Sequence, residues 1–281
     1  DIKGEYTCVT DIDKLKDLTA KLKESKEVVI VIKKQGSTIF GELTGLAVCI
    51  KPGQAFYIPT GHFYLGAPSQ IDKRIVIEAF KPIIEDEGIK KISHDIKAVH
   101  IFFKQHNIQM RGANFDTGIA SYLLNPSRSN YDIEDIAHEQ IGHNMAQFKT
   151  SAFEDVDINT ACSRACAEAD AIFQISGKLL PQLESDCLLS LFNKIEIPLA
   201  GVLSEMELNG IKVDRGYFLN LSKELEAGIG DIRKRIYSIA GLEFNINSPK
   251  QLASVLFEKL KLKPVKKTKT GFSTDEDVLK A

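Results

Sequence analysis

The sequence predicts an α/β protein in two parts, a three-layer domain over residues 1–192 and a mostly helical region over residues 193–281. Short apolar runs of strand length come first, and amphipathic helical stretches follow them, an order typical of a sheet covered by helices. From about residue 195 onward only helical periodicity recurs. At 281 residues, the chain is long enough for about two domains that each bury a core.

The predicted sheet is centred on residues 28–32 (VVIVI), a continuous apolar run suited to a strand that is buried on both faces. We expect further strands over residues 38–41, 44–50, 55–58 and 91–93. Helical periodicity predicts helices over residues 11–25, 75–84, 95–106, 116–124, 132–141 and 159–191. Asp95 is placed to cap the third of these helices.

The second part begins near residue 195 with a helix for which Pro198 is a suitable first residue and Asn209 and Gly210 a suitable end. Asp214 can cap a long helix that Gly241 terminates. Its apolar residues recur three or four positions apart, which predicts a narrow seam against one antiparallel partner helix. This apolar seam consists of Phe218, Leu221, Leu225, Ile229, Ile232, Ile236 and Ile239.

Two capping boxes follow. Ser248-Pro249-Lys250-Gln251 predicts a helix start with proline at the first helical position. Ser273 and Glu276 predict a second start, whose helix has only begun at residue 281. Because the chain also lacks an initiator methionine, we expect it to be a piece of a longer protein.

Cysteine usage and hydropathy favour an ordinary protein of a reducing compartment. Five cysteines are scattered without a CxxC motif, and Cys162 and Cys166 are expected to pack in the core, so no metal site is predicted. No run of about eighteen apolar residues occurs, so no membrane span is expected.

The net charge of −2 conceals a strongly basic segment over residues 249–271, in which a single glutamate accompanies seven lysines. A helix start, amide and hydroxyl groups and lysines are the groups that hold phosphates without reading bases. Few aromatic residues are interspersed, so a duplex backbone fits better than stacked single strands. The alternative is a solvated lysine-rich loop without a partner. The lysines are Lys250, Lys259, Lys261, Lys263, Lys266, Lys267 and Lys269.

Three stretches in this part resemble the thumb subdomain of bacterial family A DNA polymerases, the DNA polymerase I family: LAGVLSEMELNGIKVD (199–214), FNINSPKQLASVLFEKL (244–260) and KKTKTGFST (266–274). In that family the thumb grips the primer–template duplex mainly through its backbone. The resemblance implies duplex contacts by Asn245, Asn247, Ser248, Gln251, Lys266, Lys267, Thr268, Lys269, Thr270 and Ser273.

Residues 1–192 are similar to the family's 3′–5′ exonuclease domain, an RNase H-like fold, through the stretches at 44–59, 91–99, 111–126 and 164–171. Active members hold two divalent metal ions with four carboxylates and orient water with a tyrosine. Here Ile32, Lys34, Val99 and Ala169 stand at the carboxylate positions and Ala165 at the tyrosine position. We therefore expect no catalytic residue and no metal in this domain, as in the Bacillus-type members, which the chain resembles best.

Other acids remain near these positions: Asp95, Asp116, Glu168 and Asp170. We expect Asp95 and Asp116 to cap helices, and Glu168 and Asp170 point to different sides because they are two apart on a helix. Two alternatives stay open. One is a working metal-dependent exonuclease with a rearranged carboxylate set, and the other is a stand-alone DNA-binding scaffold.

The favoured interpretation is the N-terminal portion of a DNA-directed DNA polymerase that serves replication and repair in the bacterial cytoplasm, at the nucleoid. Its expected partners are double-stranded primer–template DNA and the palm and fingers of the same polymerase, with Mg²⁺ bound in the palm. The 281 residues alone are expected to have neither polymerase nor exonuclease activity.

Overall fold

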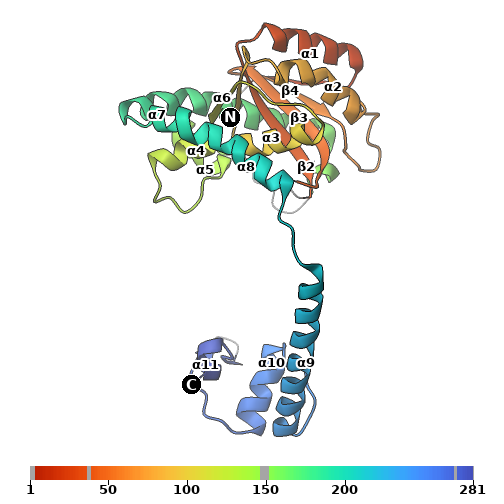
Figure 1. Cartoon of the computed structure of the whole chain (residues 1–281), viewed down its shortest axis with the longest axis vertical. Coiled ribbons are helices and arrows are strands. Elements are labelled where there is room, and N and C mark those ends of the chain that lie inside the picture. The colour runs from red at the N-terminus through yellow and green to blue at the C-terminus, as the bar shows by residue number, and fades with distance from the viewer. Residues whose placement is uncertain (1–3, 37–38, 146–151, 269–270, 281) are drawn as a thin grey trace. The chain divides into compact units, whose positions relative to one another are not determined.

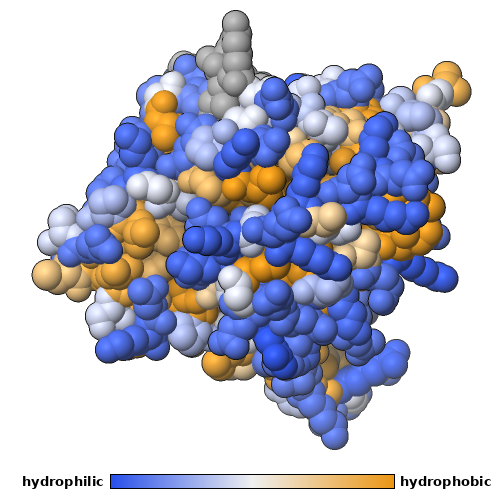
Figure 2. All heavy atoms as spheres, turned by 90° about the horizontal axis from the view of Figure 1, so that it is seen from above, coloured by the Kyte–Doolittle hydropathy of each residue, from blue (hydrophilic) through white to orange (hydrophobic). Residues whose placement is uncertain are grey.

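A computed structural model describes residues 4–36, 39–145, 152–268 and 271–280. The chain forms two compact units, a first unit Asp1–Gly210 and a second unit Ile211–Ala281, each treated by itself below (Figure 1). The first unit extends past the boundary predicted at residue 192. Hydrophilic side chains cover most of the face shown in Figure 2, with apolar groups between them.

The first unit is built on a six-stranded sheet in the order β1-β4-β3-β2-β5-β6. β2, β3 and β4 are antiparallel neighbours, whereas β1 runs parallel to β4, and β5 runs parallel to both β2 and β6. The central position of β2 agrees with the apolar run at 28–32. The strands are β1 (Glu5–Cys8), β2 (Glu27–Gln35), β3 (Glu42–Lys51), β4 (Gln54–Pro59), β5 (Lys90–Ser93) and β6 (Ala113–Asp116).

Helices cover both faces of this sheet and make the predicted three layers. Successive residues of β2 point to opposite faces, so Ile30 lies in one apolar core and Val29 in the other. The helices α1 (Ile12–Glu24), α2 (Lys73–Ile84) and α3 (Ile96–Gln105) pack in the core of Ile30. The core of Val29 is covered by α4 (Thr117–Leu124), α5 (Ile133–Ile141) and α6 (Ile158–Ser185).

Two strand predictions were incomplete or wrong. The short edge strands β1 and β6 were not predicted, because four residues each carry little alternation. The strand expected over residues 38–41 is wrong for the part that is described, since Ile39 and Phe40 form a turn between β2 and β3. Two antiparallel strands must be joined by such a reversal, and Phe40 remains exposed.

The long helix expected over residues 159–191 ends at Ser185, and Cys187 takes a left-handed φ of 60° after it. Helical structure resumes at α7 (Leu189–Leu191) and runs through a wide turn, η2 (Phe192–Glu196), into α8 (Ile197–Asn209). Pro198 therefore lies inside a continuous helix instead of starting one. Proline has no N–H for the usual bond, and the helix passes it with a longer bond from the Ile197 N–H to the Phe192 carbonyl.

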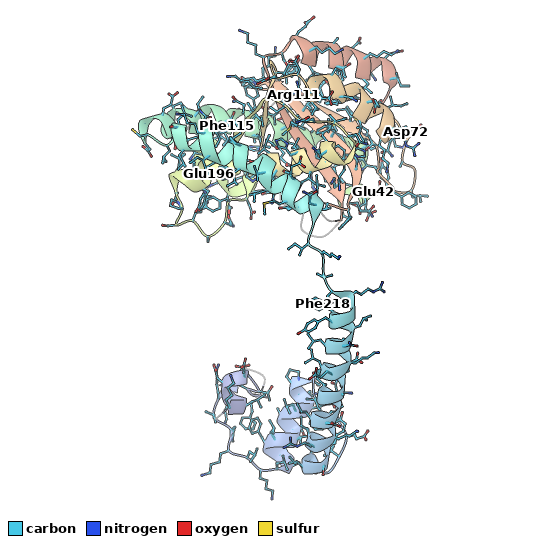
Figure 3. All side chains as sticks on the ribbon, viewed as in Figure 1. Glu42, Asp72, Arg111, Phe115, Glu196 and Phe218 are labelled. Atoms are coloured by element: carbon cyan, nitrogen blue, oxygen red, sulfur yellow. The ribbon has the colours of Figure 1, made fainter. Side chains whose placement is uncertain are left out.

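In the second unit, α9 (Arg215–Ala240) begins and ends where predicted. The Asp214 carboxylate accepts the Tyr217 N–H at 2.9 Å, and Gly241 ends the helix with φ of 66°. The apolar seam on α9 is open: Phe218, Leu225 and Ile229 are each 56% exposed. Figure 3 labels Phe218 near the start of α9. The expected antiparallel partner helix is not found among the residues that the structure describes.

The rest of the second unit consists of short helices and one hairpin. They are α10 (Pro249–Ala253), η3 (Ser254–Lys259), the hairpin of β7 (Lys267–Thr268) and β8 (Gly271–Phe272), and α11 (Glu276–Lys280). No single described helix is long and apolar enough to span a membrane, although Ile158–Ser185 with Leu189–Asn209 passes by length and composition as a bent pair.

Candidate nucleic-acid interface and a cleft at the end of strand β2

The start of α10 is held by an extended capping arrangement. Ser248 Oγ accepts the Gln251 N–H at 3.5 Å, a long contact, as the first half of a capping box requires. The second half differs from the prediction, because Gln251 Oε1 accepts the N–H of Asn245 at 2.8 Å instead of that of Ser248. The box therefore spans the whole turn that precedes the helix.

Asn245 completes this turn. Its Oδ1 accepts the Asn247 N–H at 3.0 Å, and its carbonyl oxygen accepts the Ser248 N–H at 3.0 Å. Asn245, Ser248 and Gln251 thus use side-chain groups to shape the chain, while Asn245, Asn247 and Gln251 stay exposed. The predicted contact residues at this turn form one connected structure.

The hairpin β7–β8 carries the second set of predicted residues. Lys266 Nζ lies 3.3 Å from a carboxylate oxygen of Asp275, and Lys267 Nζ lies 5.5 Å from the centre of the Phe272 ring. Hydrogen bonding to Ser273, together with Lys266, holds the pKa of Asp275 below its ordinary value. Both lysine side chains are exposed and anchored beside the hairpin.

Ser273 does not act as the predicted first residue of a capping box. It is only 3% exposed, its N–H donates to the Lys266 carbonyl at 3.0 Å, and its Oγ accepts the Asp275 N–H at 3.2 Å. Helix α11 starts at Glu276, so Asp275 takes the capping position. Ser273 therefore stabilises the link between β8 and α11.

An open groove of about 980 Å³ lies between the start of α10 and the segment that follows the β7–β8 hairpin. Ser248, Lys250 and Ser254 line it on the first side, and Ser273 and Asp275 line it on the second. Asn245 and Asn247 line a separate hollow against α9. Thr268 lies in β7, whereas Lys269 and Thr270 lie outside the described residues.

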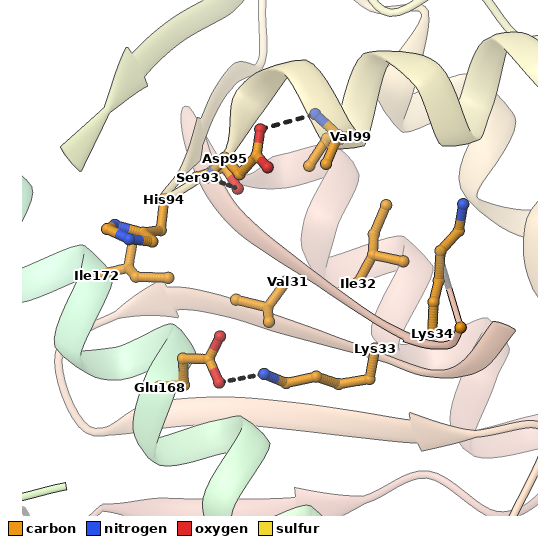
Figure 4. Close-up of a pocket in the computed structure, with 12 residues that line it drawn as sticks. Val31, Ile32, Lys33, Lys34, Ser93, His94, Asp95, Val99, Glu168 and Ile172 are labelled. Carbon is orange, nitrogen blue, oxygen red and sulfur yellow. Dashed lines mark hydrogen bonds and ion pairs between the residues drawn. The ribbon is translucent and has the colours of Figure 1, made fainter. Parts of the chain in front are cut away.

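The first unit has a cleft of about 320 Å³ where β2 ends, between α3 and α6 (Figure 4). Ile32, Lys34 and Val99 line it, and these are three of the positions that correspond to the carboxylates of the exonuclease family. Ala165 and Ala169 do not line it, because they lie on the face of α6 that is fully buried against the core. From α6, Glu168 and Ile172 reach the cleft instead.

Four acidic residues lie near the former exonuclease positions, and two of them, Asp95 and Asp116, cap helices as predicted. The exposed Asp95 accepts the Ala98 N–H at 2.9 Å at the start of α3. Asp116, 3% exposed, accepts the Ile119 N–H at 2.9 Å at the start of α4 and also the Ile96 N–H at 2.7 Å. Burial raises the pKa of Asp116 to about 7 despite these bonds.

The other two acids lie on different sides of α6. Glu168 forms an ion pair with Lys33, an interaction that the sequence did not reveal. Asp170 is fully buried and accepts from the Tyr6 hydroxyl at 3.1 Å, the Gly53 N–H at 3.0 Å and Gln174 Nε2 at 2.9 Å. Both carboxylates thus have structural partners.

The donor set of the cleft does not fit a divalent metal ion. Ile32 and Val99 offer no ligand atoms. Of the two carboxylates that line the cleft, Asp95 caps the start of α3 and Glu168 is paired with Lys33. Burial lowers the pKa of His94, whose Nδ1 lies 2.8 Å from Thr117 Oγ1. Across the described ranges, no group of three or more His, Cys, Asp or Glu side chains could hold a metal.

The three-layer unit and the helical unit together define a class of protein. Residues 53–149 match the family described as "DNA polymerase I, ribonuclease H-like domain", and residues 215–281 match "DNA polymerase family A". The RNase H-like fold predicted for the first unit is confirmed. The chain belongs to DNA polymerase family A.

Particular relatives carry the name DNA polymerase I. The chain is 33% identical to that of Pseudomonas aeruginosa over 85% of this chain and 27% of the relative, and 38% identical to that of Bacillus subtilis over 74% and 24%. A solved structure, "POL domain of Pol1 from M. smegmatis complex with DNA primer-template and dNTP", is 26% identical with a TM-score of 0.66, covering 97% of this chain and 44% of that one. The chain spans about a quarter of the curated relatives' length.

Proposed function

We propose that the chain is a portion of a DNA-directed DNA polymerase whose second unit binds the primer–template duplex. The observation that carries the proposal is the groove that joins the Ser248 helix start to the Lys266–Asp275 hairpin, within residues that match family A. A structural neighbour is described as a complex with primer–template DNA and dNTP, which supports a DNA partner. In a bacterium, this function belongs to the cytoplasm, where the chromosome lies.

The residues divide into those that shape the surface and those that meet phosphates. Asn245, Ser248, Gln251 and Ser273 keep the two turns in place through the bonds described above. Exposed Lys266 and Lys267 supply positive charge beside them, and Asn247 supplies an amide. Thr268, Lys269 and Thr270 follow Lys267 in the sequence and complete the proposed contact set.

On this proposal nucleotide transfer belongs to the palm and fingers of the whole polymerase, where carboxylates would hold Mg²⁺. The first unit would serve as an exonuclease-like scaffold that does not hydrolyse DNA. Support comes from Ile32, Lys34 and Val99 lining the cleft where metal-binding carboxylates would be needed. The 281 residues alone would therefore show neither activity.

The duplex proposal is tested by replacing Lys266 and Lys267 with glutamine. Each lost phosphate contact removes about 0.9 from the slope of log affinity against log salt, so the double variant should lose up to about 2. Affinity should fall about equally for unrelated duplex sequences, because phosphate contacts carry no base information. The measurement is fluorescence anisotropy of labelled duplexes over a range of salt concentrations.

The matched control replaces Lys14 and Lys16, exposed lysines of α1 in the first unit, with glutamine. This variant has the same net charge as the test variant and should keep the wild-type slope. An unchanged slope in the Lys266 and Lys267 variant would return the hairpin to a solvated loop without a partner.

The scaffold proposal is tested with 3′-labelled and 5′-labelled single-stranded DNA in the presence of Mg²⁺ or Mn²⁺. We expect no metal-dependent shortening, since the cleft lacks carboxylates free to bind metal. Shortening from the 3′ end that disappears in Glu168→Gln would instead show a rearranged, working nuclease.

A further inference from the structure

The end of strand β2 sends neighbouring side chains to opposite walls of the cleft. Lys33 points toward α6, where Glu168 lies, whereas Ile32 and Lys34 point toward α3 (Figure 4). Lys34 Nζ lies 5.1 Å from the centre of the Phe102 ring on that side. Lys34 therefore stands at a position where the nuclease family has a carboxylate, and Lys33 lies between two such positions.

Lys33 and Glu168 form an ion pair that joins strand β2 to the α6 wall of the cleft. Their side chains are only 20% and 17% exposed, and they join strand β2 to the middle of α6 across 135 positions of the chain. Lys33 Nζ also lies 5.5 Å from the centre of the Phe153 ring. An ion pair sheltered in this way is screened by salt much less than a surface pair.

Glu168 requires a positive partner at this position. A carboxylate that is removed from water without a counter-charge costs much free energy. In a metal-dependent nuclease that counter-charge is a divalent ion, but the donor set of this cleft does not fit one. Lys33 is the cation that the chain itself brings to Glu168.

We propose that the ammonium group of Lys33 is the built-in cation of this cleft. It neutralises Glu168 and holds the end of β2 against α6, so that the first unit keeps its folded form without any divalent metal ion. This goes beyond the proposed lack of hydrolysis, because a cleft can be inactive without an internal cation that stabilises it. The nuclease assay tests whether the cleft hydrolyses DNA. The unfolding measurements test whether Lys33 stabilises it.

The test is a double-mutant cycle in the full chain: Lys33→Met, Glu168→Gln, the two together, and the exchanged pair Lys33→Glu with Glu168→Lys. Unfolding is followed by circular dichroism, with EDTA in one series and with Mg²⁺ or Mn²⁺ in another. Hydrogen exchange of peptides from β2 and α6 localises the change. Lys16→Met is the matched control, since Lys16 and Asp13 form an ion pair with side chains 71% and 92% exposed.

Each single variant should lower the Tm by about 3–10 °C, because it leaves one sheltered charge unpaired. The double variant should lose clearly less than the sum of the singles, and the exchanged pair should recover part of the loss. Lys16→Met should stay close to wild type. Faster exchange in the single variants should appear in β2 and α6 and not in α9.

The wild-type Tm should be the same with EDTA, Mg²⁺ and Mn²⁺. Additive losses, single variants as stable as Lys16→Met, or a saturable gain in wild-type Tm with Mn²⁺ that EDTA reverses would each overturn the proposal. The last result would mean that the cleft takes up a metal ion after all.

Discussion

Asp116 shows how one buried carboxylate can organise two helices. One oxygen accepts the Ile119 N–H at the start of α4, and the other accepts the Ile96 N–H in the first turn of α3. N–H groups at helix starts favour a negative charge. Burial nevertheless has the larger effect, and it raises the pKa of Asp116 to about 7.

Replacing Asp116 with asparagine should change how stability depends on pH. The folded pKa of about 7 lies above the ordinary 3.8, so the folded chain binds this proton more tightly than the unfolded chain. The stabilising contribution of the protonated Asp116 to the free energy of unfolding is therefore present at acid pH, and it is lost as the pH rises through about 4 to 7. Relative to Asp116→Asn, the wild type should lose roughly 2–3 kcal/mol between about pH 5 and pH 8.

The measurement is urea unfolding of both proteins across this pH range. Ala120→Gly, a buried change in α4 that removes no titrating group, serves as the control and should shift stability equally at every pH. Parallel pH profiles for wild type and Asp116→Asn would contradict the prediction.

Helix α8 illustrates at the scale of an element why the first unit continues past residue 192. Ala200 is 4% exposed in the core shared with α3, and Ser204 Oγ donates to the Ala200 carbonyl at 2.7 Å and lies 3.3 Å from the Lys97 carbonyl. Ion pairs Lys97–Glu207, at 2.6 Å, and Lys104–Glu205, at 2.7 Å, flank this contact. Such half-exposed pairs contribute little, so apolar burial dominates the docking of α8.

Ala200→Glu should therefore destabilise the first unit by about 2–4 kcal/mol, because it places a charge without a partner into the contact between α3 and α8. Met206→Glu makes the same kind of change on the same helix, but Met206 is 62% exposed and the cost should be within about 0.5 kcal/mol. Denaturant unfolding compares the two. Equal losses would mean that α8 does not depend on this contact.

At the scale of the whole molecule, the chain divides into units joined at an exposed segment. Gly210 ends α8 with φ of 65°, and Ile211 and Val213 are 91% and 62% exposed. A boundary in an exposed segment is typical of a chain that folds as separate domains. The family match of residues 215–281 begins directly after it.

Fragment 1–210 should unfold with the same Tm as the first unit in the full chain. Fragment 1–192 should be less stable, because it lacks α8 and so uncovers part of the core around α3. Calorimetry of both fragments and of the full chain measures this difference. Equal stability of the two fragments would place the physical boundary at residue 192, as the sequence predicted.

Much of the fold followed from local patterns. The apolar run of β2, the caps at Asp95 and Asp214 and the end at Gly241 were predictable because each depends on a few neighbouring residues. The edge strands β1 and β6 and the continuous passage through Pro198 were not, since they depend on partners far along the chain. The α9 seam was predictable in spacing, but the residues described leave it open.

The candidate sites divide in the same way. The sequence by itself determined the family resemblance, the basic hairpin around Lys266 and the loss of carboxylates at Ile32 and Val99, because residue identity decides which ligands and charges exist. Only the tertiary structure decided how these groups are used: it turned Gln251 toward Asn245, buried Ser273 and paired Lys33 with Glu168. Such pairings depend on which distant residues packing brings within a few ångströms, and no local pattern encodes that distance.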